Sequence, residues 1–131
     1  MTASLINQAF KKCKAEGRPA LLTYTVAGDP TKKKSLDILK AISKNVDIIE
    51  SGMAFSTPIA DGGDIQTSAH RAIQAGINLN ETFKIIKAFK KSKYPRPVIL
   101  MGYWNLILQF NENKFIKMCK KSGVSGLIIV D

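Results

Sequence analysis

The sequence predicts an α/β fold built around a parallel sheet. Four short apolar segments, at 20–27, 46–50, 97–103 and 126–131, alternate with longer amphipathic segments. Amphipathic segments of that length can form the helical crossovers that parallel strands require. The apolar segments are also nearly continuous, which is typical of strands that are covered on both faces.

A helix is predicted before the first strand. Its apolar residues recur at three- and four-residue spacing and form one stripe: Leu5, Ile6, Ala9, Phe10 and Cys13. Gly17 and Pro19 end this helix. The strand at 20–27 is rich in β-branched and aromatic residues, and the turn at 28–30 leads to Thr31, which is suited to capping the next helix.

Four further helical regions are predicted between the strands. The first contains the apolar residues Leu36, Leu39 and Ile42, and the second covers 64–75 and is closed by Gly76. The third contains Asn80 and Phe83 and extends up to Pro95. The fourth contains Phe115, Met118 and Cys119 and extends up to Gly123. The second and third of these regions share one connection, so the order is a helix, then a strand and a helical connection repeated three times, then a strand. No linker or low-complexity segment divides the chain, so we expect residues 1–131 to form a single domain.

Polar residues stand at the ends of three predicted strands. Glu50 ends the second, Tyr103 the third and Asp131 the fourth, while Asp61 lies in the glycine-containing loop after the second. In parallel α/β folds, functional residues gather at the carboxyl ends of the strands. We therefore expect Glu50 and Asp61 to meet at one mouth of the fold.

The net charge of +10 raises the question of a nucleic-acid partner. Lysine greatly outnumbers arginine, and the arginines suited to bidentate contacts are Arg18, Arg71 and Arg96 alone. The lysines are dispersed, and most fall opposite the apolar stripes of the helices, where they would form solvated faces. We therefore expect no specific nucleic-acid binding.

The remaining composition favours a reduced, metal-free protein of the cytoplasm. Cys13 and Cys119 show no CxxC spacing, and both fall on apolar helix faces, so we expect buried thiols. His70 has no second histidine or nearby cysteine with which to hold a metal. No apolar run approaches the roughly 18–20 residues of a membrane span, and the amino-terminal segment has no signal-peptide core.

Two parallel folds compete at this point. A doubly wound sheet normally carries a glycine-rich phosphate turn after its first strand, but AGDP, residues 27–30, matches neither GxGxxG nor a Walker loop. A (β/α)₈ barrel fits the polar strand ends but normally needs about 250 residues, and this chain has 131.

Four segments resemble the tryptophan synthase alpha chain family in order and spacing. They are TYTVAGDP, IIESGMAFSTPIADGGDIQ followed by HRAIQAGI, VILMGYWN and GVSGLIIVD. The resemblance covers nearly the whole chain, and its central segment is highly specific. It implies a parallel (β/α) fold of the TIM-barrel type, of which this chain supplies the first four βα units with an extra N-terminal helix.

The resemblance also implies a reaction. Members of the family cleave indole-3-glycerol phosphate to indole and glyceraldehyde 3-phosphate in tryptophan biosynthesis, a retro-aldol step without a metal or organic cofactor. Glu50 matches the catalytic glutamate, which would donate a proton to indole C3 and help to deprotonate the glycerol hydroxyl. Asp61 matches the second acid, which would accept a hydrogen bond from the indole N–H. Tyr24 and Tyr103 match positions that line the indole pocket.

Simpler interpretations of these residues stay open. A glutamate at a strand end can serve only to pair with a lysine, and an aspartate before glycines is often a turn residue. The bare sequence also allows Tyr24 and Tyr103 to be packing aromatics.

The chain departs from the family at four loop positions, Ser51, Ala54, Thr57 and Gly63, where an apolar residue, a proline, an acid and a proline are customary. The positions of Ala54 and Thr57 face the beta chain in the family's alpha2beta2 tetramer, so we expect weaker docking of that partner. The chain is also half the usual length. We therefore keep two hypotheses, an active lyase and a truncated, non-catalytic half-barrel. A piece with open sheet edges is expected to self-associate as a dimer, bind a complementary half or aggregate.

Overall fold

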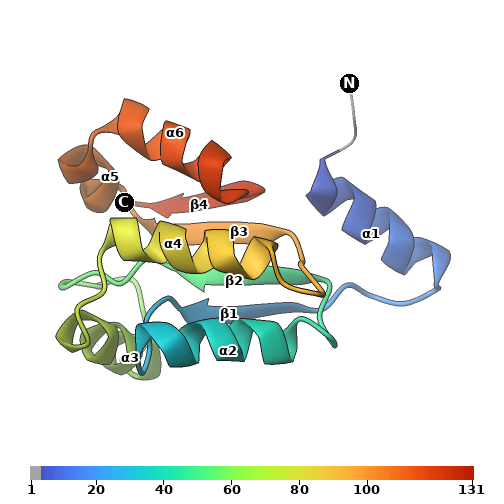
Figure 1. The fold of residues 1–131 in the computed structure, drawn as a ribbon, viewed down its shortest axis with the longest axis horizontal. Coiled ribbons are helices and arrows are strands. Elements are labelled where there is room, and N and C mark those ends of the chain that lie inside the picture. Colours follow the sequence, from blue (N-terminus) through green and yellow to red (C-terminus); the bar gives the residue numbers. More distant parts are fainter. Residues whose placement is uncertain (1–3) are drawn as a thin grey trace.

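The computed structural model describes residues 4–131, which fold around one four-stranded parallel sheet (Figure 1). The strands are β1 (Leu22–Val26), β2 (Ile48–Gly52), β3 (Val98–Tyr103) and β4 (Gly126–Val130), and they lie in chain order. Parallel strands in chain order, each joined to the next through helices, confirm the α/β prediction.

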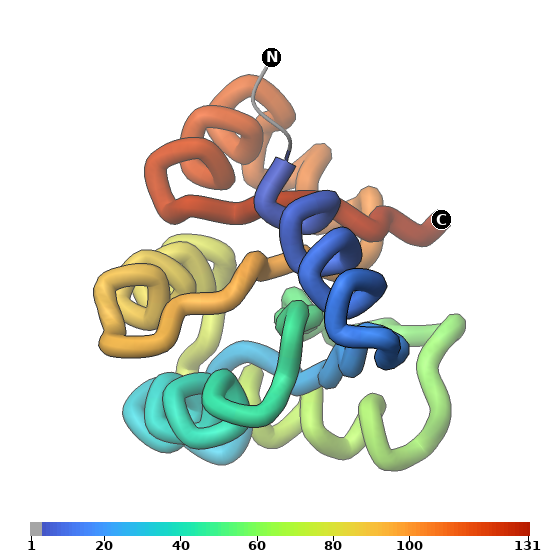
Figure 2. The backbone as a smooth tube through the Cα atoms, turned by 90° about the vertical axis from the view of Figure 1, so that its right-hand side faces the viewer, coloured from blue at the N-terminus to red at the C-terminus, as the bar shows by residue number. Residues whose placement is uncertain are grey.

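Six helices accompany the sheet in the described part of the chain: α1 (Leu5–Ala15), α2 (Lys32–Ile42), α3 (Gly63–Gln74), α4 (Leu79–Lys90), α5 (Trp104–Phe110) and α6 (Glu112–Ser122). Helices α2, α4 and α6 lie side by side along one face of the sheet (Figure 1). Figure 2, viewed along the strands, shows α1 crossing the amino ends of the strands. Helices α3 and α5 lie at the opposite, carboxyl end (Figure 1).

The main core lies between the sheet and the layer of α2, α4 and α6. Its largest fully buried members are Leu39, Ile49, Phe83, Ile86, Phe89, Val98, Leu100 and Phe115. Because side chains alternate along a strand, Ile49 and its neighbours in this core face the helices, and Glu50 faces the other way. The predicted functional glutamate therefore projects from the sheet face that these three helices leave uncovered.

Most predicted helix ends are confirmed. The Thr31 hydroxyl accepts a hydrogen bond from the backbone N–H of Lys34 at 3.2 Å and caps α2. Gly76 and Gly123 both have a φ of 83°, the left-handed conformation in which helices often end. The start of α4 was predicted too late, because Asn78 rather than Asn80 caps it.

The predicted end of the second strand is wrong by two residues. The ladder between β1 and β2 continues past Glu50 through Ser51 to Gly52, and Gly52 also aligns with Met101 of β3. Pairing on both sides extends the strand over a serine and a glycine that have little intrinsic preference for it. Glu50 consequently lies within β2 rather than at its tip.

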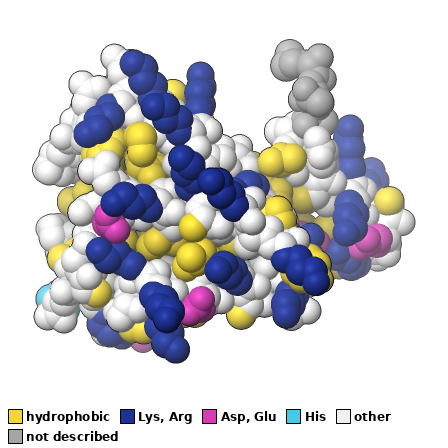
Figure 3. Space-filling view, viewed as in Figure 1, with side chains coloured by type: hydrophobic (Ala, Val, Ile, Leu, Met, Phe, Trp, Pro, Cys, Tyr) yellow, Lys and Arg dark blue, Asp and Glu magenta, His cyan; other side chains and the backbone are white. Residues whose placement is uncertain are grey.

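The predicted surface and thiol properties are confirmed in the described residues. Lysine and arginine side chains are scattered over the helix-covered face (Figure 3). Cys13 and Cys119 are both buried and free, and burial raises the pKa of the Cys119 thiol to about 11. None of the described helices combines the length and the apolar character needed to cross a bilayer.

Candidate active site

Strands β1 and β2 place Tyr24 and Glu50 next to each other. The two residues are partners in the parallel register, so their side chains leave the same face of the sheet side by side. Gly52, two residues beyond Glu50, makes room for the Tyr24 ring. A Cβ atom at Gly52 would lie 2.1 Å from the Tyr24 hydroxyl oxygen and 2.7 Å from Cζ, so only glycine fits there.

The loop between β2 and α3 brings Asp61 to the end of β3. The Tyr103 hydroxyl donates a hydrogen bond to Asp61 Oδ2 at 3.0 Å and accepts one from the backbone N–H of Ala60 at 2.9 Å. The Phe55 ring packs on the Tyr103 ring, with 4.9 Å between centroids. Tyr103 therefore fixes both the carboxylate and the backbone of this loop.

The raised pKa values of Tyr24 and Tyr103 reflect the proximity of the four predicted residues. Burial, together with the negative charges of Asp61 and Glu50 and a contribution from Tyr103, raises the pKa of the Tyr24 phenol to about 12. Burial also raises the pKa of Tyr103; the bond from Ala60 opposes this rise, and the charge of Asp61 adds to it. The phenol of Tyr24 is therefore within electrostatic reach of both carboxylates.

Helix α3 holds the other side of the loop. Gln66 Nε2 donates hydrogen bonds to the carbonyl oxygens of Asp61 at 2.8 Å and Pro58 at 3.4 Å. The loop is thus tied to the helix that follows it as well as to Tyr103 on β3.

Asp29, after β1, in turn anchors α3. Arg71 donates to its two carboxylate oxygens at 2.9 and 2.7 Å, and Ser68 also donates to it. The bonds from Arg71 hold the pKa of the Asp29 carboxyl below its usual range.

The structure thus brings the predicted residues together as two pairs, Tyr24 with Glu50 and Tyr103 with Asp61. Asp131 also acts electrostatically on Tyr103, as expected if the polar strand ends share one edge. Sequence reasoning missed the supporting residues Phe55, Gln66 and the pair of Asp29 with Arg71, because long-range contacts of this kind leave no local pattern.

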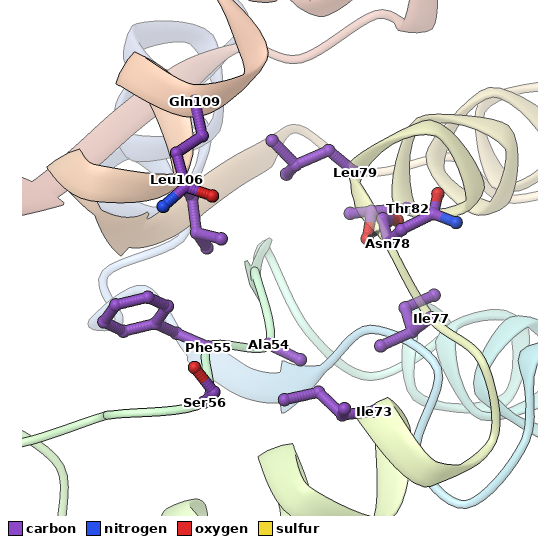
Figure 4. Close-up of a pocket in the computed structure, with 10 residues that line it drawn as sticks. All are labelled: Ala54, Phe55, Ser56, Ile73, Ile77, Asn78, Leu79, Thr82, Leu106 and Gln109. Carbon is purple, nitrogen blue, oxygen red and sulfur yellow. Dashed lines mark hydrogen bonds between the residues drawn. The ribbon is translucent and has the colours of Figure 1, made fainter.

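A separate cavity of about 260 Å³ lies behind the loop (Figure 4). Its walls come from the loop and from α3, α4, α5 and their connections: Ala54, Phe55, Ser56, Ile73, Ile77, Asn78, Leu79, Thr82, Leu106 and Gln109. None of the four predicted site residues lines this cavity. Phe55 lines it and also packs on Tyr103, whose hydroxyl holds Asp61. The cavity is therefore distinct from the candidate active site.

Metal-binding groups are few in the described residues. No set of three or more histidine, cysteine, aspartate or glutamate side chains among residues 4–131 is arranged to hold a metal ion. His70 is an exposed residue of α3. The candidate site is therefore built from carboxylates, phenols and backbone groups.

Comparisons with known proteins identify the family. Residues 10–131 match the family described as tryptophan synthase alpha chain. A tryptophan synthase alpha chain of Pelagibacter ubique is 65% identical over 128 residues, which are 98% of this chain and 48% of that protein. The chain spans about half the length of this curated relative.

Solved structures show the same fold. The tryptophan synthase alpha subunit of Legionella pneumophila superposes with a TM-score of 0.90 at 33% identity, over 99% of this chain and 50% of that one. Tryptophan synthase of M. tuberculosis in an open form gives a TM-score of 0.92 at 29% identity, over 99% and 52% of the two chains. The four strands and their helices are thus half of a TIM barrel, as expected. The chain belongs to the tryptophan synthase alpha chain family.

Proposed function

We propose that this chain carries the acid–base residues of an indole-3-glycerol-phosphate lyase, with Glu50 and Asp61 as catalytic residues. The observation that carries the proposal is the clustering of both carboxylates around Tyr24, with Asp61 held by the Tyr103 hydroxyl. Family membership supplies the reaction, since the relatives are tryptophan synthase alpha chains. Asp61 follows β2 and Tyr103 ends β3, so both lie at the carboxyl ends of the parallel strands, where such folds perform their chemistry.

The reaction breaks the bond between indole C3 and C3′ of the glycerol phosphate. Glu50 donates a proton to indole C3, and the C3′ hydroxyl loses its proton to the same carboxylate as the bond breaks. The bonding electron pair stays with the indole, and C3′ becomes the aldehyde carbon of glyceraldehyde 3-phosphate. One carboxyl group can serve both transfers because the donated proton is replaced in the same turnover.

Asp61 stabilises the ring during these transfers. Protonation at C3 leaves positive charge on the indole ring, and a fixed carboxylate that accepts a hydrogen bond from N1–H offsets that charge. The Tyr103 hydroxyl and Gln66 hold Asp61 from its side chain and its backbone, so little reorganisation is needed. The Tyr24 and Tyr103 rings supply apolar surface for the indole.

The proposal also concerns where the phosphate of the substrate binds and which protein is the partner. In the family the phosphate lies in loops after later strands, and this chain spans about half of its relatives. The whole activity therefore belongs to a closed barrel that contains this segment. We propose the tryptophan synthase beta chain as partner in an alpha2beta2 tetramer of the cytoplasm, docking near Ala54 and Thr57.

A second candidate function is a non-catalytic half-barrel that acts only through association. The observation that favours it is length, since the chain spans 48% of its Pelagibacter ubique relative and has four strands, whereas a closed barrel has eight. A half-barrel leaves Glu50 on a face that solvent can enter, which weakens proton transfer.

Indole release separates the two functions. The 131-residue chain is incubated with indole-3-glycerol phosphate, with and without a beta chain, beside a chimera in which residues 1–131 are joined to the C-terminal half of the Pelagibacter ubique relative. Indole from the chimera, lost in its Glu50→Gln variant, is the expected result. A chimera that folds as its relatives do, binds the substrate and yet releases no indole would refute the proposal.

A further inference from the structure

An open pocket lies between the end of α2 and the segment that joins α4 to β3. Both helices finish on this side of the molecule, next to the amino ends of the strands that follow them (Figure 1). The volume of the pocket is about 390 Å³, within the range of sites that hold small molecules. We call it the lysine pocket, and it is lined by Lys40, Ser43, Lys44, Ser92, Lys93 and Tyr94.

The charged groups that line the lysine pocket are all positive. Lys40, Lys44 and Lys93 are exposed, and within residues 4–131 none of their ammonium groups lies within 4.0 Å of a carboxylate. On α1, by contrast, Lys12 pairs with Glu16. Lys40 and Lys44 are also one helical turn apart, a spacing at which like charges repel. An anion placed between them would relieve that repulsion.

Capping of the helix end does not account for these lysines. Lysines near the carboxyl end of a helix often bind its last carbonyl oxygens. Here the Ser43 hydroxyl donates to the carbonyl oxygen of Lys40 at 2.8 Å, and Arg96 Nε donates to that of Ser43 at 2.7 Å. The carbonyl groups beside the pocket are therefore already satisfied by other donors.

The pocket also contains hydrogen-bond donors that the described residues leave unused. The ammonium groups of Lys40 and Lys44 donate no hydrogen bond there, and Lys93 Nζ makes only a weak contact, 5.3 Å from the centroid of the Tyr94 ring. The Ser92 hydroxyl oxygen is buried and has no partner in this part of the chain, which is costly for a polar group. Rotation about the Cα–Cβ bond of Ser92 would offer its hydroxyl to a ligand.

We propose that the lysine pocket binds a small anion that carries a diphosphate group, with Lys40, Lys44 and Lys93 as its charged contacts. A lysine ammonium group is a compact charge that suits phosphate oxygens. A diphosphate spreads several negative charges over a few ångströms, which matches three separate ammonium groups better than a single carboxylate does. The pocket lies at the other end of the strands from Asp61 and Tyr103, so the proposal stands independently of the lyase proposal.

Isothermal titration calorimetry with inorganic pyrophosphate tests the proposal, without divalent cations and at about 0.15 M salt, which screens general attraction to a basic protein. Saturable binding at a single site per chain is the expected result. The double variant Lys40→Gln with Lys44→Gln should raise the Kd by about tenfold or more. The matched control, Lys117→Gln with Lys121→Gln, removes the same charge at the same spacing from the exposed side of α6 and should change the Kd by less than about twofold.

Two further probes identify the source of the diphosphate group. Tighter binding of adenosine diphosphate than of pyrophosphate would identify a nucleotide as the ligand, and equal or weaker binding would identify free pyrophosphate. Adenosine, which has no phosphate, should not bind. Binding of adenosine as tight as that of adenosine diphosphate would overturn the proposal.

Amide chemical shifts locate the site independently of the variants. Titration with pyrophosphate should move the backbone amide signals of Lys44, Ser92 and Lys93 and leave those of α6 in place. Both measurements use the 131-residue chain and the chimera described above, which contain the same pocket. Binding that does not saturate, equal weakening in the α6 control, or shifts spread over α1 and α6 would each overturn the proposal.

Discussion

The hydroxyl of Tyr103 donates a hydrogen bond to Asp61 across 42 residues of sequence, with 3.0 Å between the oxygens. The same hydroxyl accepts a bond from the backbone N–H of Ala60, so it fixes both the side chain and the main chain of the loop. Tyr103 was expected to line a pocket for the indole ring. The structure gives it a second task, which is to position a carboxylate.

Removing this hydroxyl should therefore slow the reaction of the closed chimera without unfolding it. A hydrogen bond to a charged group contributes about 1.5–3 kcal/mol, so Tyr103→Phe should lower kcat/KM for indole release by roughly 10- to 100-fold. Tyr94→Phe is the matched control, because Tyr94 is 45% exposed and lies at the other end of the sheet, before β3. Equal rates in Tyr103→Phe and the parent chimera would refute the positioning role.

Gly52 should be intolerant of even a single methyl group. A Cβ atom there meets the Tyr24 hydroxyl at 2.1 Å, so Gly52→Ala should lower the free energy of unfolding by about 1–3 kcal/mol. Gly63→Ala is the control, since nothing lies within 4 Å of its Cβ position. Urea unfolding measures both. The double variant Gly52→Ala with Tyr24→Ala should lose less free energy of unfolding than the two single variants together, because without the Tyr24 ring the new methyl group meets no clash. Strict additivity would contradict the clash.

Restoring the proline that the family customarily has at position 63 should stabilise the chain. Gly63 is the first residue of α3, and Gly62 before it has φ −73° and ψ 167°, the conformation that a residue preceding proline prefers. Gly63→Pro should raise the free energy of unfolding by about 0.4–1 kcal/mol, measured by urea unfolding. A lower midpoint for the proline variant would show that the start of α3 is not held as described.

Stability should depend on the charge of Asp47 in a defined direction. The Arg18 guanidinium donates to its carboxylate oxygens at 2.8 and 2.8 Å, and with the Leu21 N–H it holds the pKa of Asp47 well below its usual range. Because this pKa is depressed, the ionised Asp47 stabilises the fold at pH values above the pKa of about 3.9 in the unfolded chain. The stabilisation is lost as pH falls through the pKa of the folded chain.

Asp47→Asn should consequently be less stable than the wild type at pH 7, and the two should converge in strong acid. Urea unfolding over a pH series measures the difference. The control is Asp37→Asn on the exposed face of α2, which should follow the wild-type profile. A constant difference between Asp47→Asn and the wild type from neutral to strongly acid pH would contradict this account.

The elements of the fold were predictable because periodic apolar residues encode them locally. The stripe that includes Cys13 and the run before Glu50 fixed a helix and a strand without tertiary information. The end of β2 was missed, since Ser51 and Gly52 join the strand only through the ladders to β1 and β3.

The residues of the candidate site stand out in the sequence, whereas the contacts that hold them do not. Glu50 and Asp61 stand out through their places near a strand and in a glycine-containing loop. The bond from Tyr103 and the clamp from Gln66 depend on how the loop folds back on β3 and α3, and spacing along the chain does not encode that path. The same holds for the pairing of Asp29 with Arg71.

The rate of indole release by the chimera tests the central claim most directly. The account predicts that the chimera releases indole and that Glu50→Gln and Asp61→Asn each abolish release while the folded barrel and substrate binding persist. Wild-type rates in either variant would contradict the claim that these two carboxylates perform the reaction.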